Sequence, residues 1–249
     1  MARGNKQIEG QMTFEMCLDV GNYVVQANEL IGGKQALSLN SAKLIRAAIM
    51  QVVKEDEELK PYIISISDFA ELLNVSKSNV YRDIDFITDD IIKNPVFIKS
   101  VIGNKVKWVK IPWVSRCEYI SDVGVALKLN DELKPYLIKL KDHYTQYTLD
   151  NILAMKSIYG VRIFELLQEK NLHRFLPKDG VYIELTMQEL RESCDCEDKY
   201  LKFSHFKTRV LDAAVKEIER TTLYKVSYEY IKKGRQVVAI KFHLNMMYH

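Results

Sequence analysis

Apolar residues recur along the first half of the chain at helical spacing, and short runs rich in β-branched residues interrupt them. Read in order, this pattern predicts a helix over 41–53 capped by Asn40 or Ser41, a strand over 62–66, a helix from 67 to about 73, a helix over 76–93, and two strands over 96–102 and 105–113. Gly103 and Asn104 separate the last two strands, which is typical of a hairpin turn.

The same order of elements returns in the second half. It predicts a helix over 149–171 that is broken once near 154–157, a strand over 182–185, a helix opened by a capping box at Thr186 and Glu189, a helix over 203–219, and two strands over 224–231 and 236–242 around a turn at Gly234.

Helix, strand, helix, helix and hairpin is the order of a winged helix, which is a helix-turn-helix followed by a β-hairpin wing. We therefore predict an α+β fold of two tandem winged-helix domains. A flexible tail is expected over 1–12, the first domain over 13–130 and the second domain over 131–249.

Basic residues gather at the C-terminal end of the second domain. Residues 200–249 hold ten Lys or Arg against four Asp or Glu, a net charge of +6, whereas the whole 249-residue chain carries only +3. A basic segment on a slightly acidic body points to a polyanionic partner. No amphipathic apolar face accompanies these charges, so nucleic acid is favoured over a membrane surface.

The composition also argues against several classes of protein. No apolar run approaches the ~20 residues that span a bilayer, and the basic N-terminus lacks the apolar core of a signal peptide. The four cysteines (Cys17, Cys117, Cys194 and Cys196) form no C-x-x-C pair. We expect reduced thiols in a cytoplasmic protein that has no membrane contact, no metal and no cofactor.

Catalysis is not expected either. A nuclease or a rolling-circle relaxase needs a close pair of metal-binding histidines, but the five histidines are scattered and none forms an H-x-H pair. No G-x-x-x-x-G-K-[ST] loop is present to hold ATP. The sequence therefore predicts a binding protein and not an enzyme.

The helix over 203–219 has the residues of a recognition helix. At 100° per residue, the face expected to contact the core holds Phe203, Phe206, Val210, Ala213, Ala214 and Ile218. The opposite face, which includes Asp212, places Arg209 to bind guanine in a bidentate manner. The DNA contacts predicted for this helix are Lys202, Ser204, His205, Lys207, Thr208, Arg209 and Lys216. The alternative is an ordinary amphipathic surface helix.

The turn between the last two strands is strongly basic. Lys232, Lys233 and Arg235 put three positive charges on it, and Gly234 lets the turn close without a Cβ clash. A hairpin tip beside a recognition helix reaches phosphates or the minor groove. We therefore predict that these three cationic side chains bind DNA.

The corresponding helix of the first domain, 76–93, is acidic, with a net charge of −1 and four aspartates that a phosphate backbone would repel. Only its start is suited to DNA, at Ser76, Lys77, Ser78, Asn79, Tyr81 and Arg82. The hairpin over 96–113 is expected to be its wing, with Lys105 and Lys107 on phosphates. We predict unequal roles: the second domain reads bases, while the first contacts the backbone, another protomer, or each in turn.

Several stretches resemble the Rep3-type superfamily of plasmid replication initiators, which act on iterons. They are Leu133–Lys141, Tyr147–Leu167 with its Tyr159, Arg162 and Glu165, Phe203–Ile218, and the turn at 232–235. The similarity covers most of the chain from about residue 12 onward. It implies two winged-helix domains, of which the C-terminal one makes the main major-groove contacts, at positions 204, 205 and 207–209.

The resemblance also implies partners. Members of the superfamily bind tandem repeats of double-stranded DNA at a plasmid origin as monomers, help to melt it, and recruit the host replication initiator and helicase. Many also form homodimers that repress their own promoter, so a monomer–dimer equilibrium is expected. A winged-helix transcriptional regulator without an initiator role stays the alternative, because it would bind DNA by the same physics.

Overall fold

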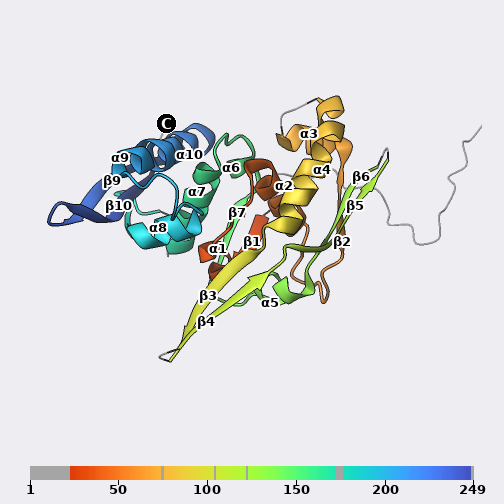
Figure 1. Ribbon diagram of the computed structural model, residues 1–249, viewed down its shortest axis with the longest axis horizontal. Coiled ribbons are helices and arrows are strands. Elements are labelled where there is room, and N and C mark those ends of the chain that lie inside the picture. Colours follow the sequence, from red (N-terminus) through yellow and green to blue (C-terminus); the bar gives the residue numbers. More distant parts are fainter. Residues whose placement is uncertain (1–22, 74–75, 104, 122, 172–175, 248–249) are drawn as a thin grey trace, which may run out of the picture.

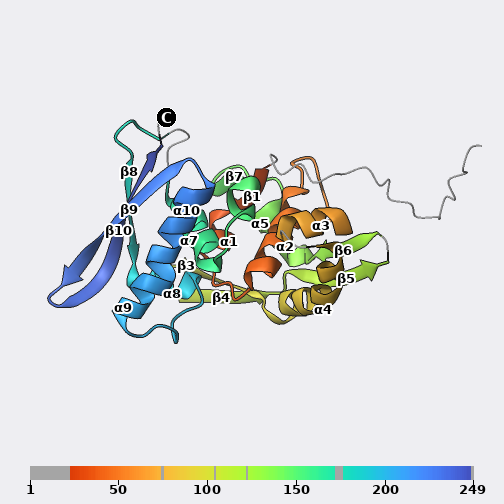
Figure 2. The same cartoon turned by 90° about the horizontal axis from the view of Figure 1, so that it is seen from above.

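A computed structural model describes residues 23–73, 76–103, 105–121, 123–171 and 176–247 (Figure 1). The expected tail over 1–12 and Cys17 lie outside these ranges. The molecule is elongated, with the wing of the C-terminal half at one end and β5 and β6 of the N-terminal half at the other (Figures 1 and 2). Within the described ranges, no helix is both long and apolar enough to cross a membrane.

The N-terminal half contains β1 (Tyr23–Ala27), α1 (Asn28–Gly32), α2 (Leu39–Met50), β2 (Pro61–Ser65), α3 (Ile66–Leu73), α4 (Lys77–Lys93), β3 (Val96–Ile102), β4 (Lys105–Ile111), β5 (Val114–Ile120) and β6 (Gly124–Leu129). The predicted start of α2 is wrong. Its N-cap is Ser38, whose hydroxyl accepts a hydrogen bond from the Ser41 amide (3.4 Å). Ser41 lies inside the helix and donates its hydroxyl proton to the Ile87 carbonyl oxygen (3.3 Å).

The C-terminal half contains η1 (Asp131–Leu133), α5 (Lys134–Leu137), β7 (Tyr144–Thr148), α6 (Asp150–Leu153), α7 (Ile158–Lys170), β8 (Val181–Thr186), α8 (Met187–Ser193), α9 (Phe203–Phe206), the π-helical turn η2 (Lys207–Asp212), α10 (Ala213–Thr221), β9 (Tyr224–Lys233) and β10 (Gln236–Met246). The predicted break near 154–157 separates α6 from α7. The capping box at Thr186 and Glu189 is also present.

Two three-stranded sheets share one strand order, β2-β6-β5 in the N-terminal half and β8-β10-β9 in the C-terminal half. In each, a helix precedes the first strand, two helices follow it, and the second strand of the closing hairpin pairs with it. This repeat confirms two winged helices. We call them the first winged helix (α2, β2, α3, α4, β5 and β6) and the second winged helix (α7, β8, α8, α9–η2–α10, β9 and β10).

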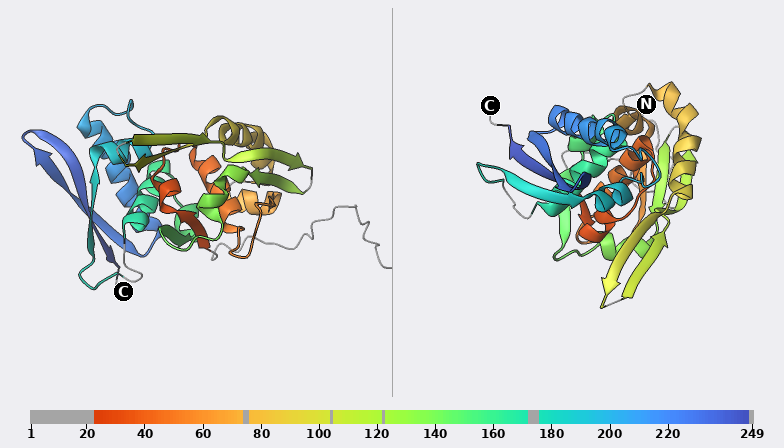
Figure 3. Two further views of the ribbon diagram at one scale, coloured as in Figure 1. Left: turned by 90° about the horizontal axis from the view of Figure 1, so that it is seen from below. Right: turned by 60° about the vertical axis from the view of Figure 1, so that its left-hand side comes forward.

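The wing of the first winged helix is β5–β6, and the prediction that it is the hairpin over 96–113 is wrong. Strands β3 and β4 form a separate two-stranded sheet inserted between α4 and β5. This inserted hairpin extends away from the side of the molecule where α4 and α9 lie (Figures 1 and 3). Gly124 permits the true wing to join β2, because a Cβ there would stand 2.1 Å from the Ile64 carbonyl oxygen.

Strand β7 returns to the N-terminal end of the described chain. It pairs antiparallel with β1, from Tyr23 opposite Thr148 to Ala27 opposite Tyr144. The segment that follows residue 130 therefore shares a sheet with the first half of the chain. The division into domains at residue 130 stays a prediction.

Three fully buried charged side chains join the two winged helices. Glu165 of α7 accepts hydrogen bonds from Arg46 of α2 at both carboxylate oxygens (2.9 Å each). The same carboxylate accepts from Arg162 (2.6 Å) and from the hydroxyl of Tyr147 on β7 (2.5 Å). A buried carboxylate with this many charge-assisted donors is held in one position.

Arg162 extends the network to two helix ends. Its guanidinium donates to the carbonyl oxygens of Ile31 (2.6 Å) and Gly33 (2.9 Å) at the end of α1, and to that of Ser193 (3.1 Å) at the end of α8. Carbonyl groups in the last turn of a helix lack intrahelical partners and carry partial negative charge. Arg162 therefore links α1 of the N-terminal half and α8 of the C-terminal half to the Glu165 carboxylate.

The electrostatics of the network stabilise the folded state above acidic pH. Burial alone would raise the pKa of Glu165, but Arg46 and Arg162 lower it from 4.5 to about 2. Because the pKa is lower in the folded protein, this stabilisation is complete above about pH 4.5 and is lost as the pH falls towards 2.

We predict that Glu165→Gln lowers the free energy of unfolding by about 3–5 kcal/mol, because it leaves two buried guanidinium groups without a counter-charge. Urea unfolding at neutral pH measures the change. Glu184→Gln, on the exposed face of β8, is the matched control and should change stability by less than about 0.5 kcal/mol. If both variants matched the wild type, the network would not hold the fold together.

Candidate nucleic-acid interface

Helices α9 and α10 and the π-helical turn between them form one continuous helix from Phe203 to Thr221, which we call the reading helix. Its buried side chains are Phe206, Val210, Leu211, Ala214, Glu217 and Ile218. The regular 100° projection did not place Leu211 inside, because a π-helical turn is wider than an α-turn and brings both Val210 and Leu211 to the core. Ala213 and Phe203, predicted in the core, are only half-buried.

The exposed face of the N-terminal half of the reading helix carries Ser204, His205, Thr208 and Arg209. The Thr208 hydroxyl donates to the Ser204 carbonyl oxygen (3.1 Å), which fixes its rotamer. Among the described residues, the side chains of Lys202, Arg209 and Lys216 have no ion-pair or hydrogen-bond partner. These cationic groups are therefore available to a ligand outside the protein.

Asp212 links the reading helix to the wing, although the sequence placed it on the outer face. It is half-buried and accepts hydrogen bonds from the Tyr228 hydroxyl of β9 (2.5 Å) and from Lys207 (2.7 Å). Burial alone would raise the pKa of Asp212, but the bonds from Lys207 and Tyr228 lower it. Lys207, a predicted DNA contact, thus donates hydrogen bonds from its ammonium group to Asp212.

An aromatic contact makes a second link between the same elements. Phe203, at the start of the reading helix, packs edge-to-face on Tyr230 of β9 with ring centroids 5.2 Å apart. Helix and wing are therefore held in one relative orientation. The contacts of Asp212, Tyr228 and Tyr230 could not be predicted from the sequence, because they depend on strand pairing, which local periodicity does not report.

The wing itself projects beyond the body of the molecule, beside the reading helix (Figure 2). Lys232, Lys233 and Arg235 are exposed at its tip, and Gly234 takes a φ of +63° in the turn. In the part of the chain that the structure describes, these three cations form no ion pair. The predicted tip of the wing is thus an unneutralised cluster of positive charge.

In the first winged helix, the helix that corresponds to the reading helix is α4, and its surface differs from that of the reading helix. Arg82 of α4 pairs with Asp83 (2.8 Å), and Asn79 is half-buried. The outward face further along α4 carries Asp85, Asp89 and Phe86, whose side chain is 69% exposed. Ser76 precedes the helix, and the side chains of Lys77, Ser78 and Tyr81 lie outside what is described. This acidic surface is unsuited to the major groove along most of its length.

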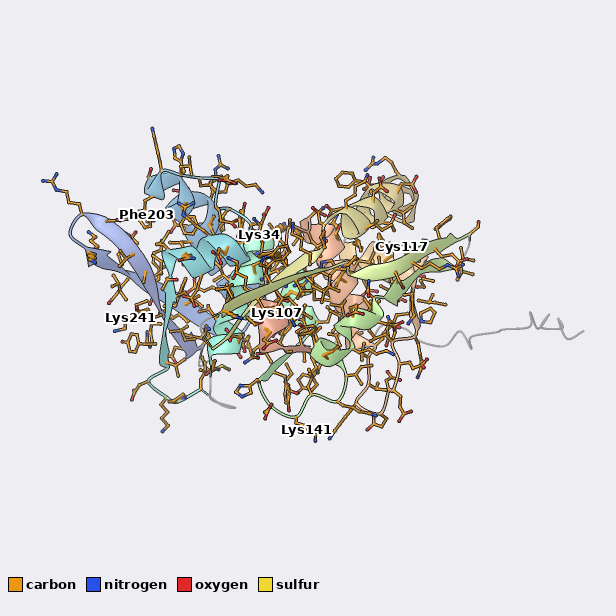
Figure 4. All side chains as sticks on the ribbon, turned by 60° about the horizontal axis from the view of Figure 1, so that its bottom comes forward. Lys34, Lys107, Cys117, Lys141, Phe203 and Lys241 are labelled. Carbon is orange, nitrogen blue, oxygen red and sulfur yellow. The ribbon has the colours of Figure 1, made fainter. Side chains whose placement is uncertain are left out.

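The cations of the first wing are paired. Arg116 of β5 bonds Glu118 (2.8 Å), and Lys128 of β6 bonds Asp131 (3.0 Å). Lys105 and Lys107 are exposed, but they belong to the inserted hairpin. Figure 4 labels Lys107 on this hairpin and Phe203 at the start of the reading helix, well apart from one another.

Ion pairs of the inserted hairpin and of Lys34 link the N-terminal half of the chain to the C-terminal half. Lys99 of β3 pairs with Glu192 of α8 (3.0 Å). Lys34, after α1, pairs with Asp195 and Glu197 (3.0 Å each) in the segment that leads to the reading helix. These ion pairs are partly exposed and add little to stability. They do hold α8 and the segment before the reading helix against the N-terminal half.

No group of three His, Cys, Asp or Glu side chains suited to a metal ion occurs among the described residues. Of the described cysteines, Cys194 and Cys196 are buried and Cys117 is half-buried, all as free thiols. Burial raises the pKa of Cys194 to about 12 and that of Cys117 to about 11. These thiols are protonated at neutral pH and pack as small apolar groups.

Fold and surface together define a two-winged-helix protein whose second winged helix presents unpaired cations at Arg209 of its reading helix and at the tip of its wing. A family model for "Initiator Replication protein, WH1" matches residues 23–168, and one for "Initiator Rep protein, WH2" matches residues 186–244. The chain belongs to this Rep3-type family of plasmid replication initiators.

Individual relatives are distant but extend over nearly the whole chain. The PI protein of Escherichia coli is 24% identical and covers 93% of this chain and 86% of its own length. An uncharacterized 27.6 kDa protein of Escherichia coli is 20% identical, over 87% of this chain and 93% of its own. The crystal structure of Pi initiator protein in complex with iteron DNA has the same fold, with a TM-score of 0.75 at 19% identity over 92% of this chain and 98% of that one.

We predict that changing Lys232, Lys233 and Arg235 together to Gln weakens binding to every duplex, and lowers the slope of log K against log salt by about two to three. Each neutralised phosphate releases counterions, so the change in slope reports how many phosphates these side chains neutralise. Fluorescence anisotropy over a salt series measures it. The charge-matched control changes Lys54, Lys141 and Lys178, which are exposed elsewhere, to Gln. Equal slopes for both triple variants would remove the wing from the interface.

Proposed function

We propose that this protein initiates plasmid replication by binding direct repeats of double-stranded DNA at the origin, and that the second winged helix reads the bases. The observation that carries the proposal is the set of unpaired cations on a helix and a wing that are clamped together by Asp212–Tyr228 and Phe203–Tyr230. Because the helix and the wing are already held in one relative orientation, binding a duplex does not have to order one against the other. The Pi initiator structure, which contains iteron DNA, supports the choice of repeats as target.

The first winged helix has a different part in this proposal. Its reading surface is limited to the start of α4, from Ser76 to Arg82, and Arg82 is already paired with Asp83. We assign it contacts to the phosphate backbone or to a second copy of the chain. Lys105 and Lys107 of the inserted hairpin remain candidates for such backbone contacts, although they do not belong to the wing.

We propose further steps, which the family membership supports. The bound protein would help to melt the origin and would recruit the host replication initiator and helicase. A homodimer in equilibrium with the monomer would repress the promoter of its own gene. We propose that these steps occur in the cytoplasm, where plasmid DNA and the host replication proteins meet.

A transcriptional regulator without an initiator role is the second candidate, because winged helices serve both purposes. Footprinting the full chain on the DNA that flanks its gene separates the two. An initiator should protect a run of direct repeats, whereas a pure regulator should protect one palindrome at the promoter. Protection of the palindrome alone would exclude the initiator role.

We predict that Arg209→Ala costs about 1–3 kcal/mol of binding to the protected repeat and relaxes the preference for one base pair. A guanidinium bound to guanine in a bidentate manner contributes both affinity and discrimination. Competition against repeats carrying each single substitution measures both. Lys225→Ala, at the end of β9 away from the wing tip, loses the same charge and should change neither. If Arg209→Ala bound every competitor as the wild type does, the reading face would be wrongly placed.

A further inference from the structure

Leu201 is the most exposed large apolar side chain in the described part of the chain. Its exposed fraction is 75%, and it stands two residues before the reading helix. Both of its aromatic neighbours along the chain turn inward. Tyr200 packs edge-to-face on Tyr159 (6.0 Å between centroids), and Phe203 packs on Tyr230.

The backbone is shaped to produce this arrangement. Tyr200 adopts a φ of +52°, a left-handed conformation that L-residues with bulky side chains rarely take. The conformation turns the Tyr200 ring towards α7 while the next residue, Leu201, faces outward. The Tyr200 carbonyl oxygen also accepts a hydrogen bond from Arg191 (3.0 Å), so the strained conformation is held by its surroundings, as strained residues at ligand-binding sites are.

A single exposed leucine is common on protein surfaces and by itself indicates nothing. The position of Leu201, just before the N-terminal end of the reading helix, is what suggests a role in DNA binding. The N-terminal end of a recognition helix is the part that enters the major groove. Leu201 is followed there by the exposed Lys202 and Ser204, which have the chemistry for phosphates and base edges.

Leucine offers only a nonpolar contact, which narrows the choice of base. Of the groups that a base pair presents in the major groove, the C5-methyl of thymine is the apolar one. We propose that Leu201 packs against a thymine methyl and thereby makes the second winged helix prefer thymine beside the bases read by Arg209. This inference rests on the proposed reading of double-stranded DNA by the second winged helix.

Deoxyuridine gives a test confined to the methyl group. A random-sequence duplex pool is enriched on the full wild-type chain, and each thymine of the recovered duplex is replaced in turn by deoxyuridine. At one or two thymines this replacement should weaken wild-type binding about fourfold, which is the effect expected from the loss of one buried methyl group. Leu201→Ala should bind the thymine duplex about four- to tenfold less tightly, and should not distinguish thymine from deoxyuridine at those positions.

Leu223→Ala is the matched control. Leu223 is 59% exposed at the opposite end of the reading helix, just before β9. Its variant should bind as the wild type does and keep the same response to deoxyuridine. Circular dichroism of both variants checks that neither exposed substitution has altered the fold.

Two results would overturn the inference while leaving DNA reading intact. One is a Leu201→Ala variant that binds as the wild type does while Arg209→Ala is weakened. The other is a loss of affinity in Leu201→Ala that leaves the response to deoxyuridine unchanged, which would make Leu201 a wedge between base steps. If the pool yielded no enriched sequence, the proposed function would fail, and this inference with it.

Discussion

The carboxylate of Glu165 and the two guanidinium groups of Arg46 and Arg162 are the constraint on which the rest of this structure depends. All three are buried, so the loss of Glu165 would leave two guanidinium groups without a counter-charge in a medium that solvates them poorly. Their bonds reach α2, α7, β7 and the ends of α1 and α8. The reading helix packs on α7, which carries two of the three charges. This ionic centre therefore helps to set the position of the reading helix relative to the first winged helix.

A second constraint, at the surface, is the pair of contacts that hold the wing of the second winged helix to the reading helix. Asp212 and Phe203 hold the wing to the reading helix through Tyr228 and Tyr230, while Arg209 and the wing tip keep their charges unpaired. The first winged helix shows the opposite pattern, with Arg82, Arg116 and Lys128 each bonded to an acid. Two copies of one topology thus differ in how their cations are paired, and this difference supports the proposal that they have unequal roles on DNA.

Features set by local chemistry were predictable from the sequence. The capping box at Thr186, the break before α7, the wing turn at Gly234 and the exposed face of the reading helix all depend on residues within a few positions of one another. The repeated order of elements was enough to predict two winged helices, because each element has its own period.

Features set by distant partners were not predictable. The identity of the first wing depends on β6 pairing with β2, which lies far earlier in the chain, and periodicity does not encode such pairing. Arg162 and Glu165 carry the family resemblance, but their burial requires Arg46, which lies more than a hundred residues away. The π-helical turn moved Leu211 inward and Asp212 to the wing, which a regular projection could not anticipate.

Base-methylation interference combined with hydroxyl-radical footprinting, on a single repeat bound by the full chain, tests the unequal use of the two winged helices most directly. The first method reports contacts to purine edges in the grooves, and the second reports contact along the sugar-phosphate backbone. The account predicts backbone protection over the whole repeat, with purine interference concentrated in the half that faces the second winged helix. Interference of equal strength in both halves would contradict it.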